Sequence, residues 1–284
     1  MAKGTIDTIP LIEFKKRKDS ELEFEIAPLK RLFTWAKSGR LDHPIEKVHR
    51  VQFNQIIIIE EGSGTHWVDF KEFKYRAGDA ILVSKNQVQA FTAENPPKAW
   101  HILFTDSFYV EQFIPWIFND VLIHLGESFD QVRYSILATE AEYRRKNDKN
   151  PEIIRHLLHA LILLIARKTT NANATITHPV LIVRFFERLR SDLHKHRRAE
   201  HYADQLGCSY KHLNQTCQKF LKASAKNLID HAVILEIKRQ LATTDHSLKQ
   251  IADAFHFEDD SNFLKYFKQR TKQTPRDFRI TFQK

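Results

Sequence analysis

Apolar positions between residues 48 and 104 come in short runs separated by glycine, asparagine or proline. Runs of this length at a spacing of about 8–12 residues are typical of an antiparallel sandwich or small barrel. We predict strands at Val48–Glu61, Thr65–Phe70, Phe73–Arg76, Ala80–Ser84, Val88–Thr92 and Trp100–Phe104. Gly62-Ser63-Gly64 joins two of these strands, and we interpret it as a hairpin turn because no helix follows it.

From Ser107 onward the apolar spacing changes to three and four residues, which predicts helices. One stripe consists of Phe108, Phe113, Ile117 and Val121. A clearer stripe follows Pro151, a residue suited to a first helical turn, and consists of Ile153, Leu157, Leu161, Leu164 and Ile165. Thr169–His178 has no periodicity, and we interpret it as a linker.

The chain after the linker is predicted to be entirely helical and nearly repeats itself. Tyr202–Leu206 resembles Ile251–Phe255 at an offset of 49 residues. At an offset of 50, five positions match: Leu213, Cys217, Lys222, Ala225 and Leu228 correspond to Phe263, Phe267, Lys272, Pro275 and Phe278. One residue is therefore inserted in the turn of the second copy, and the two copies indicate a duplicated structural unit.

Each copy has the pattern of a helix, a short turn and a second helix. In the first copy, Ala199–Leu206 ends at Gly207, and Ser209 is a good cap for a helix that buries Leu213, Cys217 and Phe220. In the second copy, Asp259 or Asp260 caps a helix that buries Phe263, Tyr266 and Phe267. Between them, Lys226–Leu241 predicts a helix about 24 Å long with Leu228, Ala232, Leu235 and Ile237 on its apolar faces.

The second helix of each copy turns polar side chains outward, namely Lys211, Asn214, Gln215, Gln218 and Lys222 in the first and Asn262, Lys265 and Gln269 in the second. Asn and Gln amides can pair with adenine, and Lys can reach guanine or a phosphate. One such helix alone is more often a solvated face. Two at matched positions favour a double helix-turn-helix that binds duplex DNA.

Charge divides the 284-residue chain, which is long enough for two domains. Residues 1–175 hold 24 Lys/Arg against 23 Asp/Glu, whereas residues 176–284 hold 20 against 12. The basic second half favours a polyanionic partner, although an ordinary basic surface gives the same count. Two lone cysteines, no signal peptide and no apolar run of about 20 residues predict a cytoplasmic protein without a membrane partner.

The motifs resemble those of the AraC/XylS family of bacterial transcription regulators. The similarity covers about 100 residues and is carried by Tyr202–Ser209, His212-Leu213, Ser247–Ala252, Phe257–Phe263, Phe267-Lys268 and Thr274–Arg279. The first half resembles the cupin-like sensor domain of that family in its strand order and in Gly62-Ser63-Gly64 and Ala77-Gly78-Asp79.

The resemblance implies a multidomain α+β protein. Residues 1–170 would form a cupin-like antiparallel β-barrel with packed helices, which senses an effector or dimerises. Residues 178–284 would form an all-α, seven-helix domain with two helix-turn-helix units. The implied function is that of a sequence-specific transcription regulator, which we expect to be an activator. Its partners would be promoter DNA, RNA polymerase, a small effector and a second copy of the chain.

Carried over by position, base-reading residues are Lys211, Asn214 and Gln215 in the first unit and Asp260, Ser261 and Lys265 in the second, with Asn262 adjacent. The chain departs from the family at several sites. Lys222, His256 and Lys272 replace usual glycines, Cys217 replaces a core aromatic, and Val233 replaces an arginine. Lys222, Lys268 and Lys272 are candidate phosphate contacts.

Cupin enzymes need a cluster of histidine and carboxylate ligands. Here His49 stands alone on its strand, Gln89 occupies the position of a later histidine, and His66 and His101 are scattered. We therefore predict no metal, no cofactor and no enzymatic activity, against the alternatives of a cupin isomerase or dioxygenase and of a single-strand or RNA-binding module. His49, Gln55, Trp67 and Gln89 are candidates for a small-molecule pocket or are ordinary barrel residues.

Overall fold

The structure is a computed structural model, and it describes residues 10–16, 22–41, 45–92, 96–109, 121–145, 148–168 and 180–282. The chain divides into two compact units, one containing the described residues 10–168 and the other the described residues 180–282. Each unit is described by itself.

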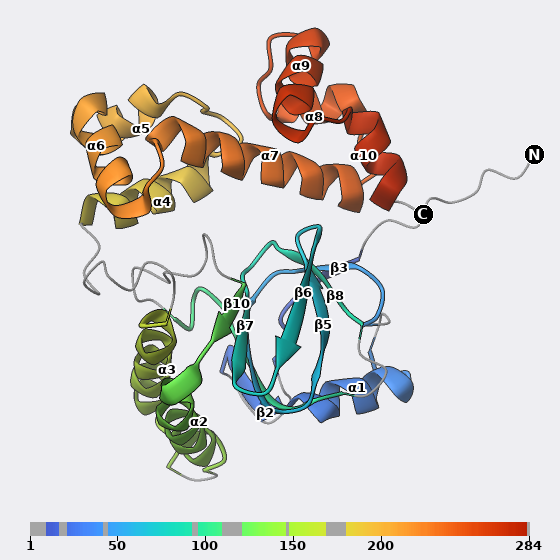
Figure 1. The fold of residues 1–284 in the computed structure, drawn as a ribbon, viewed down its shortest axis with the longest axis vertical. Coiled ribbons are helices and arrows are strands. Elements are labelled where there is room, and N and C mark those ends of the chain that lie inside the picture. Colours follow the sequence, from blue (N-terminus) through green and yellow to red (C-terminus); the bar gives the residue numbers. More distant parts are fainter. Residues whose placement is uncertain are drawn as a thin grey trace, which may run out of the picture. The chain divides into compact units, whose positions relative to one another are not determined.

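The N-terminal unit is built on two five-stranded sheets (Figure 1). The first sheet has the order β1-β3-β8-β5-β6, with β1 at Leu11–Ile12, β3 at His49–Val51, β8 at Val88–Phe91, β5 at Ser63–Val68 and β6 at Lys71–Arg76. The second has the order β10-β7-β4-β9-β2, with β10 at Leu122–His124, β7 at Asp79–Val83, β4 at Asn54–Glu61, β9 at Lys98–Phe104 and β2 at Phe24–Pro28. Helix α1 is Leu29–Lys37.

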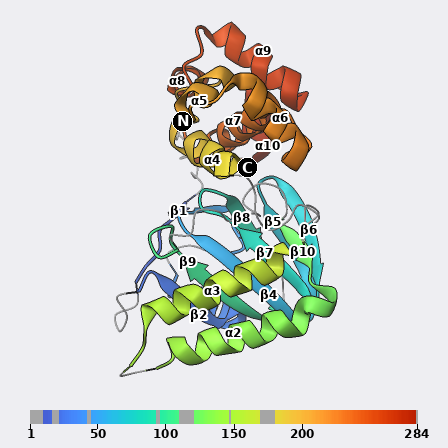
Figure 2. The ribbon, with the colours of Figure 1, turned by 90° about the vertical axis from the view of Figure 1, so that its left-hand side faces the viewer.

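The second sheet is buried on both of its faces, which explains the unbroken run Ile56–Ile59 in β4. Because side chains alternate along a strand, Ile57 and Ile59 belong to the core cluster that also holds residues of the first sheet. Ile56 and Ile58 belong to the cluster beneath α2 at Phe129–Tyr143 and α3 at Pro151–Ala166. These two helices lie side by side across that sheet, and the short 3₁₀ turn Gly126–Ser128 precedes α2 (Figure 2).

Two strand predictions are wrong in detail. Val48–Glu61 is not one strand, because β3 pairs with β8 in the first sheet while β4 pairs with β7 and β9 in the second. Gly62-Ser63-Gly64 is not a hairpin turn, because β4 and β5 lie in different sheets. Gly62, at φ +96°, begins the crossing between them, and Ser63 already starts β5. Local turn chemistry cannot reveal such a crossing, since the pairing partners lie far away in the sequence.

The helical predictions after Ser107 are confirmed in part. Residues 110–120, which include Phe113 and Ile117 of the first stripe, and the predicted linker Thr169–His178 lie outside the described residues. Strand β10 follows directly after Val121. In α3, Pro151 occupies the first turn and the Asn150 side chain accepts a hydrogen bond from the Glu152 N–H. Leu161 and Ile165 are buried as predicted, and the other buried positions are Ile154, Leu158 and Ile162. Of the remaining predicted positions, Ile153 is exposed and Leu157 and Leu164 are partly exposed.

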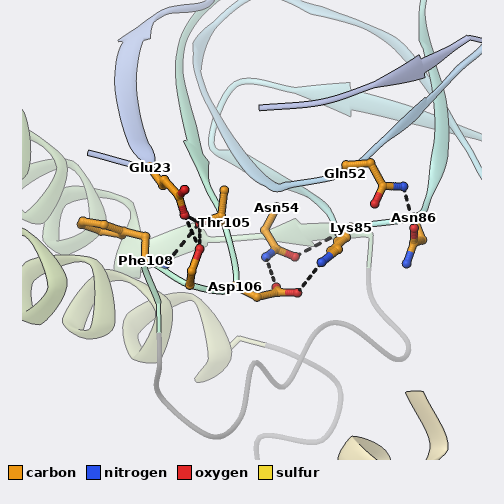
Figure 3. Close-up of polar contacts among 9 residues, drawn as sticks. Glu23, Gln52, Asn54, Lys85, Asn86, Thr105, Asp106 and Phe108 are labelled. Atoms are coloured by element: carbon orange, nitrogen blue, oxygen red, sulfur yellow. Dashed lines mark hydrogen bonds and ion pairs between the residues drawn. The ribbon is translucent and has the colours of Figure 1, made fainter. Parts of the chain in front are cut away.

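A polar network holds the end of β9 against neighbouring loops (Figure 3). The buried Asn54 uses both ends of its amide, since Nδ2 donates to Asp106 Oδ1 at 2.9 Å and Oδ1 accepts from the Lys85 N–H at 3.1 Å. Glu23 accepts from Ser107 and from Thr105 Oγ1, and these hydrogen bonds lower the pKa of its carboxyl group. The network fixes the chain as it leaves the sheet.

The C-terminal unit contains seven helices within residues 180–282, as the family resemblance implies. They are α4 at Val180–Asp192, α5 at Ala199–Gln205, α6 at Tyr210–Leu221, α7 at Ala225–Thr243, α8 at Leu248–Ala254, α9 at Asp260–Thr271 and α10 at Pro275–Phe282. Figure 1 shows α5 and α6 near one end of α7, with α8, α9 and α10 toward the other. None of the helices in the described part of the chain is both long and apolar enough to span a membrane.

The central helix α7 is longer than predicted and buries other residues. Of the four predicted apolar positions, only Ile237 is fully buried, whereas Leu228, Ala232 and Leu235 are partly exposed. The fully buried positions include Ile229 and Val233, the latter at the site where the family usually has arginine. Helices α5, α6, α8 and α10 all pack against α7, so its buried surface is broader than a single amphipathic stripe.

Candidate functional site

The two helix-turn-helix units of the C-terminal unit close their first helices with the same pair of hydrogen bonds. In the first unit, the N–H groups of Gly207 and Cys208 donate to the carbonyls of Asp204 and Ala203, both at 3.0 Å. In the second, His256 and Phe257 donate to Asp253 at 2.9 Å and Ala252 at 3.0 Å. The offset of 49 seen in the sequence is therefore a repeat in backbone geometry.

The second helix of each unit is capped as predicted, with one ambiguity resolved. The Ser209 hydroxyl accepts from the His212 N–H at 3.2 Å at the start of α6. At the start of α9 the cap is Asp259 rather than Asp260, and its Oδ1 accepts from the Asn262 N–H at 2.7 Å. Each cap satisfies a backbone donor that the helix itself leaves unpaired, and so defines where α6 and α9 begin.

Three residues that replace family glycines retain the backbone conformation that glycine would adopt. His256 ends α8 at φ +51°, and Lys222 and Lys272 end α6 and α9 at φ +54° and +65°. The left-handed conformation costs a residue with a Cβ roughly 1 kcal/mol relative to glycine. The turns are preserved in spite of the substitutions, and each of the three carries strain.

Lys272→Gly should therefore raise the free energy of unfolding of the C-terminal unit by about 1 kcal/mol, because it removes the strain at φ +65°. The matched control is Lys268→Gly within α9, which should lower that free energy by about 1 kcal/mol because glycine disfavours a helix interior. Urea unfolding followed by circular dichroism at 222 nm measures both. Changes of the same sign in the two variants would contradict the strain at Lys272.

In the first unit, the structure separates the predicted base-reading residues into two kinds. Lys211 and Gln215 are exposed on α6, as a DNA contact requires. Asn214 is half-buried, and its Oδ1 accepts from the Ala225 N–H at 3.1 Å at the start of α7. Asn214 thus holds the connection between α6 and α7. The predicted core residue Cys217 is fully buried, and burial raises the pKa of its thiol to about 12.

In the second unit, Asp260, Ser261, Asn262 and Lys265 are all exposed on α9. The Asn262 Nδ2 donates to Asp259 Oδ2 at 2.9 Å, so this amide is tied to the helix cap. The candidate phosphate contacts Lys222, Lys268 and Lys272 are exposed as well. The predicted sites on both helices therefore present charged and amide groups to solvent.

A groove of about 770 Å³ runs along the same side of α9, and we call it the basic groove. Its lining carries Asn262, Lys265 and Gln269 from α9, opposite residues of the segment that connects α4 to α5 and of the start of α7. Six lysines and arginines face it against one carboxylate, Glu258; they are Lys195, Arg197, Arg198, Lys226, Lys265 and Arg270. The groove therefore favours an anionic partner.

A buried carboxylate fixes α9 to α7 beside this groove. Asp230 accepts hydrogen bonds from Lys226 Nζ at 2.6 Å, Tyr266 OH at 2.8 Å and Arg270 Nη2 at 2.6 Å. Burial alone would raise the pKa of Asp230, but these three donors outweigh burial and lower that pKa below its ordinary value. The contact of Asp230 with α9 could not be predicted from local patterns, because Tyr266 and Arg270 lie 36 and 40 residues away in the chain.

The N-terminal unit contains a cavity of about 480 Å³ between its two sheets and α1. Apolar side chains make up most of the lining, among them Phe14, Trp35, Phe53, Phe91 and Leu103. Three of the four predicted pocket residues, His49, Gln55 and Gln89, line it, together with His101. Trp67 does not, because residues alternate along β5 and its side chain points away from the face that carries His66 and Val68.

The buried histidines and glutamines form two hydrogen-bonded chains. His49 Nδ1 lies 3.0 Å from the Lys47 carbonyl and must donate to it, which leaves His49 Nε2 to accept from Gln89 Nε2 at 3.1 Å. Gln89 Oε1 then accepts from His66 Nε2 at 3.0 Å. Separately, His101 Nε2 donates to Gln55 Oε1 at 2.7 Å. The acceptor role of His49 Nε2 requires that this ring is neutral.

The predicted isolation of His66 and His101 is wrong, since both lie in this buried cluster. Burial lowers the pKa of His66 to about 4 and that of His101 to about 3, which keeps both uncharged at neutral pH. Within the described residues, no group of three or more His, Cys, Asp or Glu side chains has the arrangement of a metal site. Strand register brings these residues together, and it could not be derived from the spacing of histidines.

Known proteins resemble both units. Residues 39–174 match the model of an AraC-like ligand binding domain, and residues 202–280 match that of a helix-turn-helix domain. The HTH-type transcriptional activator RhaS of Klebsiella pneumoniae (strain 342) is 20% identical over 262 residues, covering 87% of this chain and 92% of the relative. RhaS of Yersinia pseudotuberculosis serotype I (strain IP32953) is 21% identical over 248 residues, covering 81% and 88%.

Among solved structures, ToxT from Vibrio cholerae O395 matches with a TM-score of 0.42 and 14% identity over 82% of this chain and 90% of that protein. The two family models follow one another along the chain in the order of a sensor and a DNA-binding domain. The family consists of transcription regulators, not of enzymes. The chain therefore belongs to the AraC family of transcription regulators, with an AraC-like ligand-binding domain followed by a helix-turn-helix DNA-binding domain.

Proposed function

We propose that α6 and α9 read base edges in two successive major-groove segments of duplex DNA, with Lys211 and Gln215 acting from α6 and Lys265, Ser261 and Asp260 from α9. The observation that carries the proposal is the repeated geometry of the two units, which have the same closing hydrogen bonds and side-chain caps. Helix α7, with 19 residues, is about 28 Å long. That length suits the roughly 34 Å repeat of the groove.

Positive charge supplies the sequence-independent part of this binding. The basic groove, together with Lys222, Lys268 and Lys272 at the ends of α6 and α9, offers contacts to the phosphate backbone. Asn214 and Asn262 have a smaller part in base reading than the exposed side chains, because their amides already serve the fold. Binding to one DNA sequence needs both contributions, because phosphate contacts supply affinity and base contacts supply selectivity.

Selection of bound duplexes from a random library, followed by titration of the selected duplex, tests the base-reading residues. Lys265→Ala and Gln215→Ala should each cost about 1–3 kcal/mol on the selected duplex and much less on an unrelated duplex. Lys71→Ala, an equal loss of charge on β6 of the other unit, is the control and should change neither. Equal losses on both duplexes would contradict base reading.

Asn214→Ala serves as a separate comparison. It should weaken binding to both duplexes and lower the free energy of unfolding by about 1–3 kcal/mol, because the buried Ala225 N–H loses its acceptor.

We also propose that the 480 Å³ cavity of the N-terminal unit binds a small effector and that the effector changes promoter occupancy. Its buried, convergent polar groups within an apolar wall are typical of ligand sites. Titration of promoter binding with and without an effector would test the coupling between the two units.

We also propose two protein partners, RNA polymerase and a second copy of the chain. The relatives named above are activators, which supports activation through contact with RNA polymerase in the cytoplasm. Tyr134 and Leu137 on α2 and Ile153 on α3 are exposed apolar residues, which supports a homodimer through these helices. Sedimentation velocity of the wild type and of Leu137→Asp would test the dimer, since a charge there should favour the monomer.

A further inference from the structure

The side chain of Gln55 has a buried donor without a partner in the wall of the cavity. Gln55 is 2% exposed, and its Oε1 already accepts from His101 Nε2 at 2.7 Å. Its Nε2 is buried, and it has no hydrogen-bond partner in the structure. A buried unpaired N–H is unfavourable, and an acceptor placed in the cavity would remove that cost.

The other polar groups deep in the cavity are uncharged and already paired with one another. Gln89 donates to His49 and accepts from His66, so both ends of its amide are used. One ion pair of the lining lies close to Gln55, because Glu25 and Gln55 are both in register with Leu103, on its two sides. Arg31 pairs with Glu25 at 2.5 Å, and Glu13, Lys15 and Arg40 are exposed to solvent. An anionic group beside Gln55 would therefore lie near the Glu25 carboxylate, and Arg31 is already paired with that carboxylate.

The walls also limit how polar a ligand can be. Aromatic side chains from four segments, Phe14, Trp35, Phe53 and Phe91, line the same cavity as Gln55. A polyhydroxylated ligand would place most of its hydroxyl groups against these rings, where they would lack partners. An apolar or aromatic body instead buries well there.

We propose that the cavity takes an uncharged, largely apolar ligand whose inner end carries one hydrogen-bond-accepting oxygen, as in a ketone, ester or amide, bound by Gln55 Nε2. The inference rests on the proposed effector cavity and names the chemical class of its occupant. The opposite arrangement, an amphipathic acid held by Arg40 or Lys15 at the mouth, is the outcome that would replace it.

Three probes of the same shape separate these chemistries in the full-length protein. They are 4-phenylbutan-2-one, which has a carbonyl oxygen, (3-methylbutyl)benzene, which replaces that oxygen with a methyl group, and 3-phenylpropanoate, which is anionic at neutral pH. Calorimetric titration should show the ketone binding about tenfold more tightly than the hydrocarbon. The ketone should bind on the order of 100-fold more tightly than the acid.

Gln55→Met removes the donor and keeps the length of the side chain, so it should abolish the preference of the ketone over the hydrocarbon. Gln52→Met is the matched control, because Gln52 lies outside the cavity and bonds to Asn86. It should leave the preference unchanged. If Gln55→Met does not fold, the comparison of the three probes on the wild-type protein still decides the class.

Equal binding of ketone and hydrocarbon, or tighter binding of the acid, would overturn the proposed class, and binding of none of the three would overturn the cavity as their site. Titration of the selected DNA duplex on the same protein samples keeps the two proposals apart. A protein that binds its duplex but prefers the acid contradicts the ligand class alone. A protein that binds the ketone but no duplex contradicts the proposed base reading alone.

Discussion

Lowering the pH from 7 to 5 should destabilise the N-terminal unit by about 4 kcal/mol, through the buried His66 and His101. Both have folded-state pKa values far below the ordinary 6.5, at about 4 and about 3. Above pH 6.5 such a histidine is neutral in both the folded and the unfolded protein, so it does not lower the free energy of unfolding there. As the pH falls, the unfolded state takes up the proton and the folded state does not. Each histidine then costs about 1.4 kcal/mol per pH unit until its folded pKa is reached.

Tryptophan fluorescence isolates this effect, because all four tryptophans precede residue 177 and none lies in the C-terminal unit. Urea unfolding followed by this signal should show a free energy of unfolding that falls by about 2.5 kcal/mol per pH unit between pH 6 and 5. His66→Gln or His101→Gln should halve that slope, whatever it does to stability at pH 7. His156→Gln, on the exposed side of α3, should leave the slope unchanged. A flat wild-type profile between pH 7 and 5 would contradict the burial of both neutral rings.

Asp230→Ala should destabilise the C-terminal unit by about 3 kcal/mol and disrupt the placement of α9. The substitution leaves three donors, Lys226 Nζ, Tyr266 OH and Arg270 Nη2, without their shared acceptor. Breaking a buried ion pair from one side commonly costs 3–5 kcal/mol. The lower end is expected here because the Lys226 and Arg270 side chains are 44% and 27% exposed and regain water.

Urea unfolding followed by circular dichroism at 222 nm measures this loss. The unfolding transition of the N-terminal unit, followed by tryptophan fluorescence, should not change. Binding of the selected duplex should weaken as well, since α9 carries the second set of base-reading residues. Asp253→Ala, which removes an exposed carboxylate from α8, is the control for the change in charge. A change of less than 0.5 kcal/mol for Asp230→Ala would show that α9 is held by its aromatic core alone.

The effect of the buried histidines and the effect of Asp230 differ in their pH dependence as well as in the spectroscopic signal that reports them. The pKa of Asp230 lies below its ordinary value, so the carboxylate keeps its charge and its three donors at pH 5. The stability that it contributes is lost only as the pH falls through that lowered value. Acid down to pH 5 should therefore affect the N-terminal unit first.

Features that depend on neighbouring residues could be predicted well. The sequence predicts Ser209 as the cap of α6 and narrows the cap of α9 to Asp259 or Asp260, because a cap needs only the first turn of its own helix. Gly207 closes α5 at φ +65° for the same reason. Features that depend on pairing between distant strands could not be predicted. The crossing at Gly62 and the break between β3 and β4 follow from which strand each segment pairs with.

The same distinction between local and long-range features applies to the candidate sites. Lys211, Gln215 and Lys265 lie on exposed helical faces, and helical periodicity alone places them there. Asn214 has the same periodicity, but contact with the start of α7 gives it an additional structural role. The cluster of His49, His66, Gln89, Gln55 and His101 draws on strands of both sheets, so its existence depends on strand register.

The amino-acid sequence by itself determined the order of the two domains, the duplicated helix-turn-helix and, with the exception of Asn214, the outward-facing polar residues of its second helices. Helices, caps and repeats are encoded over a few neighbouring residues. Only the tertiary structure decided that His66 bonds to Gln89 and His101 to Gln55, that Gln55 keeps an unpaired donor in a cavity, and that Asp230 joins α7 to α9. These features arise where segments far apart in the chain pack together, and burial there sets the hydrogen bonding and the charge of each group.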